Sequence, residues 1–176
     1  MKLIILDRDG VINYDSAQFI KSPDEWKPIP GSIEAIARLS QADYRVVVAT
    51  NQSGIGRSLF DMETLNAIHS KMHKAVNQAG GRIEAIFYCP ATAESNSPYR
   101  KPAPGMFEEI GERMNVVLTG VPAVGDSLRD LEAAAAVGAR PILVLTGKGQ
   151  KTQEMTLPPG TETYADLAAV ARALTA

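Results

Sequence analysis

The hydrophobic positions of this chain fall into short apolar runs that alternate with segments of helical spacing. The first run, Leu3 to Leu6, is too short for an independent helix and is typical of a strand buried on both faces. Similar runs predict further strands at 44–49, 85–88, 121–124 and 141–145. Apolar residues at helical spacing predict helices at 33–41, 62–79, 106–114, 128–137 and 166–174.

The alternation of strands and helices predicts a three-layer α/β/α, Rossmann-like fold with a mostly parallel sheet. We expect one domain over residues 1–176, because the chain has no repeat and no linker. The segments between the strands are too short for a separate cap domain. Ser32 is the predicted N-cap of the first helix and Asp61 that of the second. Residues 11–27 have no clear period and are predicted to form a long loop.

The net charge, the apolar patterning and the cysteine content argue against several classes of protein. The formal net charge is −2, so no basic excess is available to neutralise a nucleic-acid backbone. No leader or membrane-spanning pattern is evident, and Cys89 is the single cysteine, which excludes an internal disulfide. We expect a cytoplasmic monomer with no nucleic-acid or membrane partner.

Polar side chains with complementary chemistry follow four of the predicted strands. In chain order they are Asp7 and Asp9, Thr50 and Asn51, Arg100 and Lys101, and Asp126 with Asp130. The carboxyl ends of parallel strands share one edge of a sheet, so these groups are expected to converge. Carboxylates suit Mg²⁺, and a lysine with a hydroxyl suits phosphoryl oxygens. The set predicts phosphoryl transfer, although Asp7 to Gly10 alone is equally compatible with a solvated turn.

These residues resemble the motifs of the haloacid dehalogenase (HAD) superfamily of aspartate-nucleophile phosphatases. The matching stretches are Asp7-Arg8-Asp9-Gly10, Thr50-Asn51, Lys101-Pro102 and Gly125-Asp126 through Asp130. Within the superfamily, residues 7–13, 50–55 and 100–106 resemble the family of heptose-bisphosphate and histidinol-phosphate phosphatases. The resemblance covers essentially the whole chain. It implies Mg²⁺-dependent hydrolysis of the 7-phosphate of D-glycero-D-manno-heptose 1,7-bisphosphate, in the pathway to the lipopolysaccharide core.

The resemblance also implies roles for single residues. Asp7 would attack phosphorus, and Asp9 would protonate the leaving sugar oxygen and later deprotonate water. Mg²⁺ would be bound by Asp7, the Asp9 carbonyl and Asp126. Thr50 and Lys101 would hold the phosphoryl group, and Asp130 would orient Lys101 or a metal-bound water. Substrate contacts are implied for Asp15, Ser16, Ala17, Gln18, Thr50, Asn51, Gln52, Ser53 and Arg100.

One departure from the family concerns zinc. The family often has a zinc loop with Cys-x-His and Cys-x-Cys before Arg-Lys-Pro, but here Ala91, Ser97 and Tyr99 leave only Cys89. One thiolate cannot form a tetrahedral site, so we predict that zinc is absent.

Several residues have a second interpretation. Ser127 to Asp130 has the spacing of a capping box, a role that is compatible with catalysis. Arg57 is either a sugar-phosphate contact or a solvated side chain. His69 and His73 have metal-ligand spacing, but no third ligand accompanies them, so a solvated or partly packed pair is the preferred interpretation.

Two other functions compete with the first. A histidinol-phosphate phosphatase, or another small-molecule phosphomonoesterase, would have the same motifs. A phosphoacceptor signalling module also gathers acids, a threonine and a lysine at strand ends. In such modules the acceptor aspartate follows the third strand, whereas here the paired acids follow the first. An open site also leaves a macromolecular phosphate as a conceivable substrate.

Overall fold

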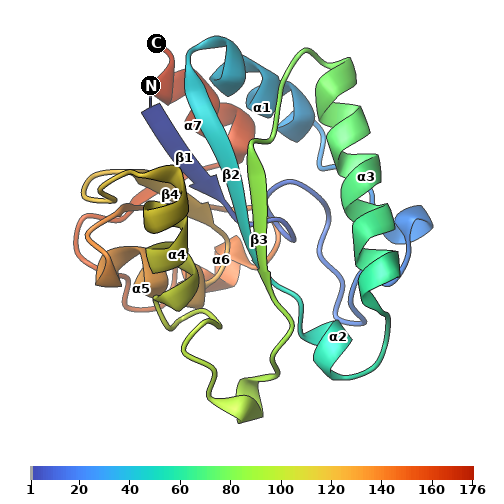
Figure 1. The fold of residues 1–176 in the computed structure, drawn as a ribbon. Coiled ribbons are helices and arrows are strands. Elements are labelled where there is room, and N and C mark those ends of the chain that lie inside the picture. Colours follow the sequence, from blue (N-terminus) through green and yellow to red (C-terminus); the bar gives the residue numbers. More distant parts are fainter. Residues whose placement is uncertain (1) are drawn as a thin grey trace.

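The computed structural model describes residues 2–176, and its central feature is a sheet of six strands that all run parallel (Figure 1). The strand order is β3-β2-β1-β4-β5-β6. The strands are β1 (Lys2–Leu6), β2 (Tyr44–Asn51), β3 (Ala85–Cys89), β4 (Pro122–Gly125), β5 (Arg140–Val144) and β6 (Glu162–Tyr164). This order places the first strand near the middle of the sheet.

Helices connect the strands. They are α1 (Ser32–Gln41), α2 (Ser53–Gly56), α3 (Met62–Gln78), α4 (Gly105–Met114), α5 (Leu128–Ala136), α6 (Gly149–Thr152) and α7 (Leu167–Leu174). Two single 3-10 turns lie at Pro23–Glu25 and Ala93–Ser95. None of the helices within residues 2–176 combines the length and the apolar character that crossing a bilayer requires.

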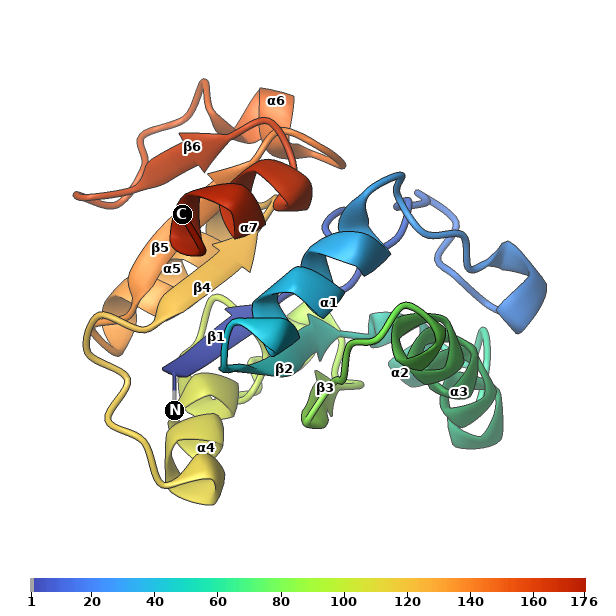
Figure 2. The ribbon, with the colours of Figure 1, turned by 90° about the horizontal axis from the view of Figure 1, so that it is seen from above.

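The sheet separates two hydrophobic cores, one on each face. Helices α1, α3 and α7 cover one face, and α4 and α5 cover the other (Figure 2). Alternate residues of β1 point into different cores: Ile4 and Leu6 pack beneath the first group of helices, and Leu3 and Ile5 beneath the second. Both faces of β1 are therefore covered, as the continuous apolar run predicts.

Strand register brings the strand ends together. Leu6 pairs with Val48 of β2 and with Val124 of β4, so the residues that follow all three strands emerge at the same edge. The Asp7 amide extends the ladder by donating to the Val124 carbonyl at 2.9 Å. The parallel sheet and the predicted α/β/α architecture are thereby confirmed.

The structure corrects local details of the prediction. Gly31, with a φ of 87°, is the N-cap of α1 in place of Ser32. The Ser32 hydroxyl instead donates to the Val11 carbonyl at 2.8 Å and ties the helix to the loop after β1. Asp61 caps α3 as predicted, accepting from the Thr64 amide at 2.9 Å. The short elements α2, α6 and β6 were not predicted, because three or four residues carry too little periodic signal.

Candidate active site

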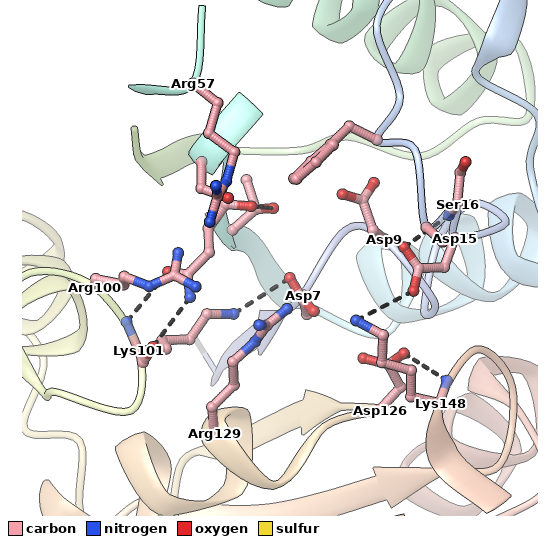
Figure 3. Close-up of a pocket in the computed structure, with 15 residues that line it drawn as sticks. Asp7, Asp9, Asp15, Ser16, Arg57, Arg100, Lys101, Asp126, Arg129 and Lys148 are labelled. Atoms are coloured by element: carbon pink, nitrogen blue, oxygen red, sulfur yellow. Dashed lines mark hydrogen bonds and ion pairs between the residues drawn. The ribbon is translucent and has the colours of Figure 1, made fainter. Parts of the chain in front are cut away.

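A polar pocket lies at the carboxyl ends of β1, β2 and β4 (Figure 3). The predicted residues that line it are Asp7, Asp9, Asp15, Ser16, Ala17, Thr50, Asn51, Ser53, Arg57, Arg100, Lys101 and Asp126. Gln18 and Gln52 do not line this pocket: Gln18 is exposed, and Gln52 is buried behind Asp9. Four separate segments of the sequence thus contribute side chains to one cavity.

Lys101 is buried at the centre of an ion-pair chain. Its ammonium lies 2.7 Å from Oδ1 of Asp130 and 3.2 Å from Oδ1 of Asp7, and it donates to the Ala49 carbonyl at 2.8 Å. Burial alone would lower the pKa of Lys101, but Asp130 and Asp7 outweigh that effect and raise it. Lys101 is therefore a fixed positive charge beside the Asp7 carboxylate.

Three carboxylates gather beside this lysine. Oxygen atoms of Asp7, Asp126 and Asp130 lie within 4.8 Å of one another, and all three side chains are buried. Burial and the neighbouring Asp130 raise the pKa of Asp7 well above its ordinary value, and the same two causes raise the pKa of Asp126 to about 7. Burial and a neighbouring carboxylate thus oppose the ionisation of Asp7 and Asp126, and a hard divalent cation bound between these two acids would offset that penalty.

Asp130 has less freedom to bind a metal than the other two acids. Its Oδ1 accepts from Lys101, and its Oδ2 accepts from the Ser127 amide at 3.1 Å. The same side chain therefore completes the capping box of α5 and also pairs with Lys101, and its role in the reaction stays a prediction. Of these three buried acids, Asp7 and Asp126 line the pocket, and Asp130 does not.

Hydrogen bonds and close contacts with neighbouring backbone segments fix the position of Asp126. Its Oδ2 accepts from the Lys148 amide at 2.9 Å, and its carbonyl accepts from the Thr152 hydroxyl at 2.7 Å. Gly10 and Gly147, both with positive φ, lie so close that a Cβ on either would overlap the Asp126 carboxylate. The loop between β5 and α6 is thus part of the wall that holds this acid.

Asp9 lies across the pocket in a different environment. Its Oδ1 accepts from Asn13 and from Arg8, both at 2.9 Å, and its Oδ2 accepts from Gln52 at 3.3 Å. Burial would raise the pKa of Asp9, but Arg8 and these hydrogen bonds outweigh burial and lower it. The two acids of the first motif therefore differ in their electrostatics: the pKa of Asp7 is raised, and that of Asp9 is lowered.

The second and third motifs are joined by a pair of hydrogen bonds. The Asn51 side chain donates to the Lys101 carbonyl at 3.1 Å and accepts from the Lys101 amide at 3.2 Å. The Thr50 hydroxyl, almost fully buried, accepts from Gln52 at 2.9 Å. Asn51 therefore sets the position of the lysine backbone as well as lining the pocket.

Most of the charged side chains of the pocket are segregated by sign, and the exception is Lys148, which lies beside Asp15 (Figure 3). Arg57, Arg100, Lys101 and Arg129 lie on one side of Asp7, and Asp9, Asp15 and Asp126 lie on the other. Arg100 donates to the Ala91 carbonyl at 3.2 Å, and Arg57 lies 3.6 Å from Glu94. Burial and then the neighbouring Arg129 lower the pKa of Arg100, which marks a concentration of positive charge. The basic side is suited to an anionic group beyond the reacting phosphate.

Sequence reasoning missed three residues that line the pocket: Phe19, Arg129 and Lys148. Arg129 lies between Asp126 and Asp130, and that position within the fourth motif is the signal that could have identified it. Its Nε is buried without a hydrogen-bond partner in residues 2–176. Lys148, whose ammonium lies 3.6 Å from Asp15, follows a strand end and could have been identified by the same rule as the four motifs.

The loop after β3, in which the family resemblance would place zinc ligands, is joined to the rest of the protein by hydrogen bonds and an ion pair. Gly56 donates its amide to the Pro90 carbonyl at 3.1 Å, and Arg57 pairs with Glu94. Cys89 is buried at the end of β3. These contacts join the loop to α2, and the absence of zinc stays a prediction.

Comparison with known proteins identifies the family. A model described as HAD-hydrolase-like matches residues 98–170, and one described as polynucleotide kinase 3 phosphatase matches residues 2–127. A D-glycero-beta-D-manno-heptose-1,7-bisphosphate 7-phosphatase from Bordetella bronchiseptica is 61% identical over 99% of this chain and 98% of its own length. The protein of the same name from Pseudomonas aeruginosa is 55% identical over 98% of this chain and 97% of its own.

A solved structure agrees with these matches. The D,D-heptose 1,7-bisphosphate phosphatase from B. bronchiseptica, complexed with magnesium and phosphate, has a TM-score of 0.97 and 61% identity, covering 99% of this chain and 98% of that one. The similarity therefore spans the fold and the sequence together. The chain belongs to the D-glycero-beta-D-manno-heptose-1,7-bisphosphate 7-phosphatase family of HAD-type phosphoric monoester hydrolases.

Proposed function

We propose that this phosphatase hydrolyses the 7-phosphate of D-glycero-D-manno-heptose 1,7-bisphosphate through an aspartyl-phosphate on Asp7. The observation that carries the proposal is the position of Asp7, which is buried between the Lys101 ammonium at 3.2 Å and the Asp126 carboxylate. Family membership supports the choice of substrate. The placement of the heptose in the lipopolysaccharide core pathway is part of the same proposal.

Asp7 is the nucleophile in this account. Its Oδ1 accepts from the Arg8 amide at 2.8 Å and from Lys101, and these two contacts fix the plane of the carboxylate. A bond forms between an Asp7 oxygen and phosphorus while the bond from phosphorus to the sugar oxygen breaks. Lys101 and the Thr50 hydroxyl are placed to hold phosphoryl oxygens during the transfer.

Mg²⁺ fits the donor set of the pocket. Asp7 and Asp126 would bind it through carboxylate oxygens and Asp9 through its backbone carbonyl, a set of hard oxygen ligands. When bound, the cation would offset the negative charge of the phosphoryl oxygens. Asp130, whose oxygens are occupied by Lys101 and Ser127, is assigned to orienting Lys101.

Asp9 moves the protons. It gives a proton to the departing sugar oxygen. In the second half-reaction it takes a proton from the water that attacks phosphorus, while the bond from phosphorus to the Asp7 oxygen breaks and inorganic phosphate is released. The lowered pKa of Asp9 keeps the carboxyl ionised in the free pocket. The negative charge of an entering phosphate favours its protonation, which prepares the acid form for the first step.

The basic side of the pocket is proposed to bind the 1-phosphate. Arg57, Arg100 and Arg129 present guanidinium groups that can donate paired hydrogen bonds to its oxygens. The loop 15–17 and Ser53 would contact the sugar between the two phosphates. This arrangement favours a bisphosphate over histidinol phosphate, whose other end carries an amine and an imidazole in place of an anion.

Further expectations belong to this proposal: a cytoplasmic monomer, one domain over 1–176, no zinc, and no nucleic-acid or membrane partner. The formal net charge of −2 supports a small-molecule substrate over a polynucleotide.

Phosphate release with Mg²⁺ from the heptose bisphosphate, from histidinol phosphate and from a 3′-phosphorylated oligonucleotide tests the proposal. The largest kcat/KM is expected for the bisphosphate. A preference for either other substrate would overturn the assignment.

A further inference from the structure

Arg8, the residue between the two acids of the first motif, is a fully buried charge. Its side chain has 0% exposure, and its Nε and Nη2 both contact Oδ1 of Asp9, at 2.9 and 2.8 Å. Its Nη2 also lies 3.5 Å from Oε1 of Gln52. A buried guanidinium must find acceptors for its donors, so its neighbours decide where it lies.

The remaining contact of this guanidinium is with His69, on the second turn of α3. Nη1 of Arg8 lies 3.1 Å from Nε2 of His69, and the imidazole is buried with 7% exposure. No other hydrogen bond to Nη1 occurs within residues 2–176. His69 and His73 have metal-ligand spacing, but Nε2 of His69 faces the Arg8 guanidinium. This contact leaves Nε2 unable to bind a metal shared with His73.

The ring of His69 acts as an acceptor. An arginine is always protonated and can only donate, so Nε2 must carry the lone pair and Nδ1 the proton. Burial and the charge of Arg8 lower the pKa of His69 to about 3, which agrees with a neutral ring. The chain of contacts therefore runs from His69 through Arg8 to Asp9.

Asp9 depends on this chain for its orientation. Arg8 and Asn13 occupy Oδ1, whereas Oδ2 has only the longer contact to Gln52 at 3.3 Å. Arg8, bound side-on to Oδ1, leaves Oδ2 as the less constrained oxygen of a carboxylate that lines the pocket. A proton is then favoured on Oδ2, from which it can be passed to a leaving group. Displacement of Arg8 would free Oδ1 and remove this preference for Oδ2.

We propose that His69 is a positioning residue, which holds the Arg8 guanidinium through Nε2 and thereby presents Oδ2 of Asp9 to the leaving oxygen. The inference rests on the proposed role of Asp9 as the acid. It assigns a part in the reaction to helix α3, which contributes no residue to the lining of the pocket.

Leaving-group dependence separates this role from a structural one. A sugar alkoxide must be protonated as it departs, whereas p-nitrophenolate is a stable anion that departs without a proton. Because kcat/KM reports the steps through release of the leaving group, poor positioning of the acid lowers it for the sugar phosphate selectively. A general loss of folded enzyme lowers kcat/KM for both substrates by one factor.

The test compares His69→Leu, His69→Asn and His69→Gln on the heptose bisphosphate and on p-nitrophenyl phosphate. The Leu and Asn variants remove the acceptor at the position of Nε2 and are expected to lower kcat/KM for the bisphosphate by about tenfold or more, with a much smaller change for the aryl ester. The Gln variant, whose Oε1 can reach that position, is expected to restore most of the loss. His73→Leu, on the same helix, is the matched control.

Equal losses on the two substrates, or no recovery with Gln, would overturn the inference. If His69→Leu fails to fold, the comparison of Asn with Gln gives the same decision. Asp9→Asn is measured in parallel, because it tests the underlying role of the acid. Selective loss in Asp9→Asn without selective loss in the His69 variants refutes the positioning role alone, and no selectivity in Asp9→Asn refutes the proposed acid itself.

Discussion

The ammonium of Lys101 lies 2.7 Å from Oδ1 of Asp130, and both side chains are almost fully buried. This pair places a lysine from the loop after β3 against the first turn of α5. Since Lys101 also contacts Asp7, the position of the proposed phosphoryl-binding charge depends on Asp130.

Asp130→Asn is expected to lower both stability and activity. The amide can still accept from the Ser127 amide as a helix cap, but it leaves Lys101 with one carboxylate fewer. Breaking a buried pair is expected to lower the unfolding free energy by about 3 kcal/mol in denaturant titration. Displacement of Lys101 is expected to lower kcat/KM by about 100-fold. Glu132→Gln, on the exposed side of the same helix, is the control. Wild-type activity in Asp130→Asn would show that Asp130 serves only as the cap of α5.

Gly10→Ala is expected to weaken magnesium binding. Gly10 has a φ of 86°, and a Cβ there would overlap the Asp126 carboxylate. Gly120→Ala is a matched control, because Gly120 has a φ of 76° and nothing within 4 Å of its Cβ position. Both variants should lose about 1–2 kcal/mol of stability from backbone strain. Only Gly10→Ala should raise the Mg²⁺ concentration for half-maximal activity, by about tenfold; an equal rise in both would contradict this role of Gly10.

Arg129→Met is expected to weaken binding of the second phosphate. The buried, unpaired Nε and the pocket-lining guanidinium fit an anion that is not hydrolysed. Loss of a charged hydrogen bond should raise KM for the 1,7-bisphosphate about tenfold or more, with little change for the 7-monophosphate. Arg113→Met, on exposed α4 surface, serves as the control. An equal change for the two substrates would remove Arg129 from the 1-phosphate site.

Acidification is expected to destabilise the protein partly through His69. Its pKa falls from 6.5 in the unfolded chain to about 3 in the folded protein, so the unfolded state binds more protons between these values. The contribution to stability is complete above pH 6.5 and is lost as pH falls toward 3. At pH 4 the loss amounts to about 3 kcal/mol. Unfolding free energies of His69→Gln should fall less steeply over this range than those of His73→Gln, and identical slopes would contradict a buried neutral His69.

The sequence was sufficient for the main features of the fold because its strands are continuous apolar runs. Val46 to Val48 and Leu3 to Leu6 are buried on both sides of the sheet, and the polar residues that follow them could be assigned to one edge. β6 could not be predicted in this way, because three residues of mixed exposure give no period.

Contacts between residues that lie far apart in the sequence were harder to predict than the strand-end motifs. His69 is 61 positions from Arg8, and neither residue reveals the contact by its spacing. The family pattern over residues 50–53 implies a substrate contact for Gln52, whereas the structure buries this side chain behind Asp9. Arg129, within the fourth motif, and Lys148, after the end of β5, also line the pocket, and both could have been identified from their places beside strand ends.

The central claim, a covalent intermediate on Asp7, is tested most directly by trapping that intermediate. Enzyme turning over heptose 1,7-bisphosphate with Mg²⁺ is quenched in acid, reduced with borohydride and analysed by peptide mass spectrometry. The account predicts that an aspartyl phosphate is reduced to homoserine at position 7, and that Asp7→Asn shows neither this product nor turnover. Turnover without a reducible acyl phosphate in the native enzyme, or undiminished turnover in Asp7→Asn, would contradict it.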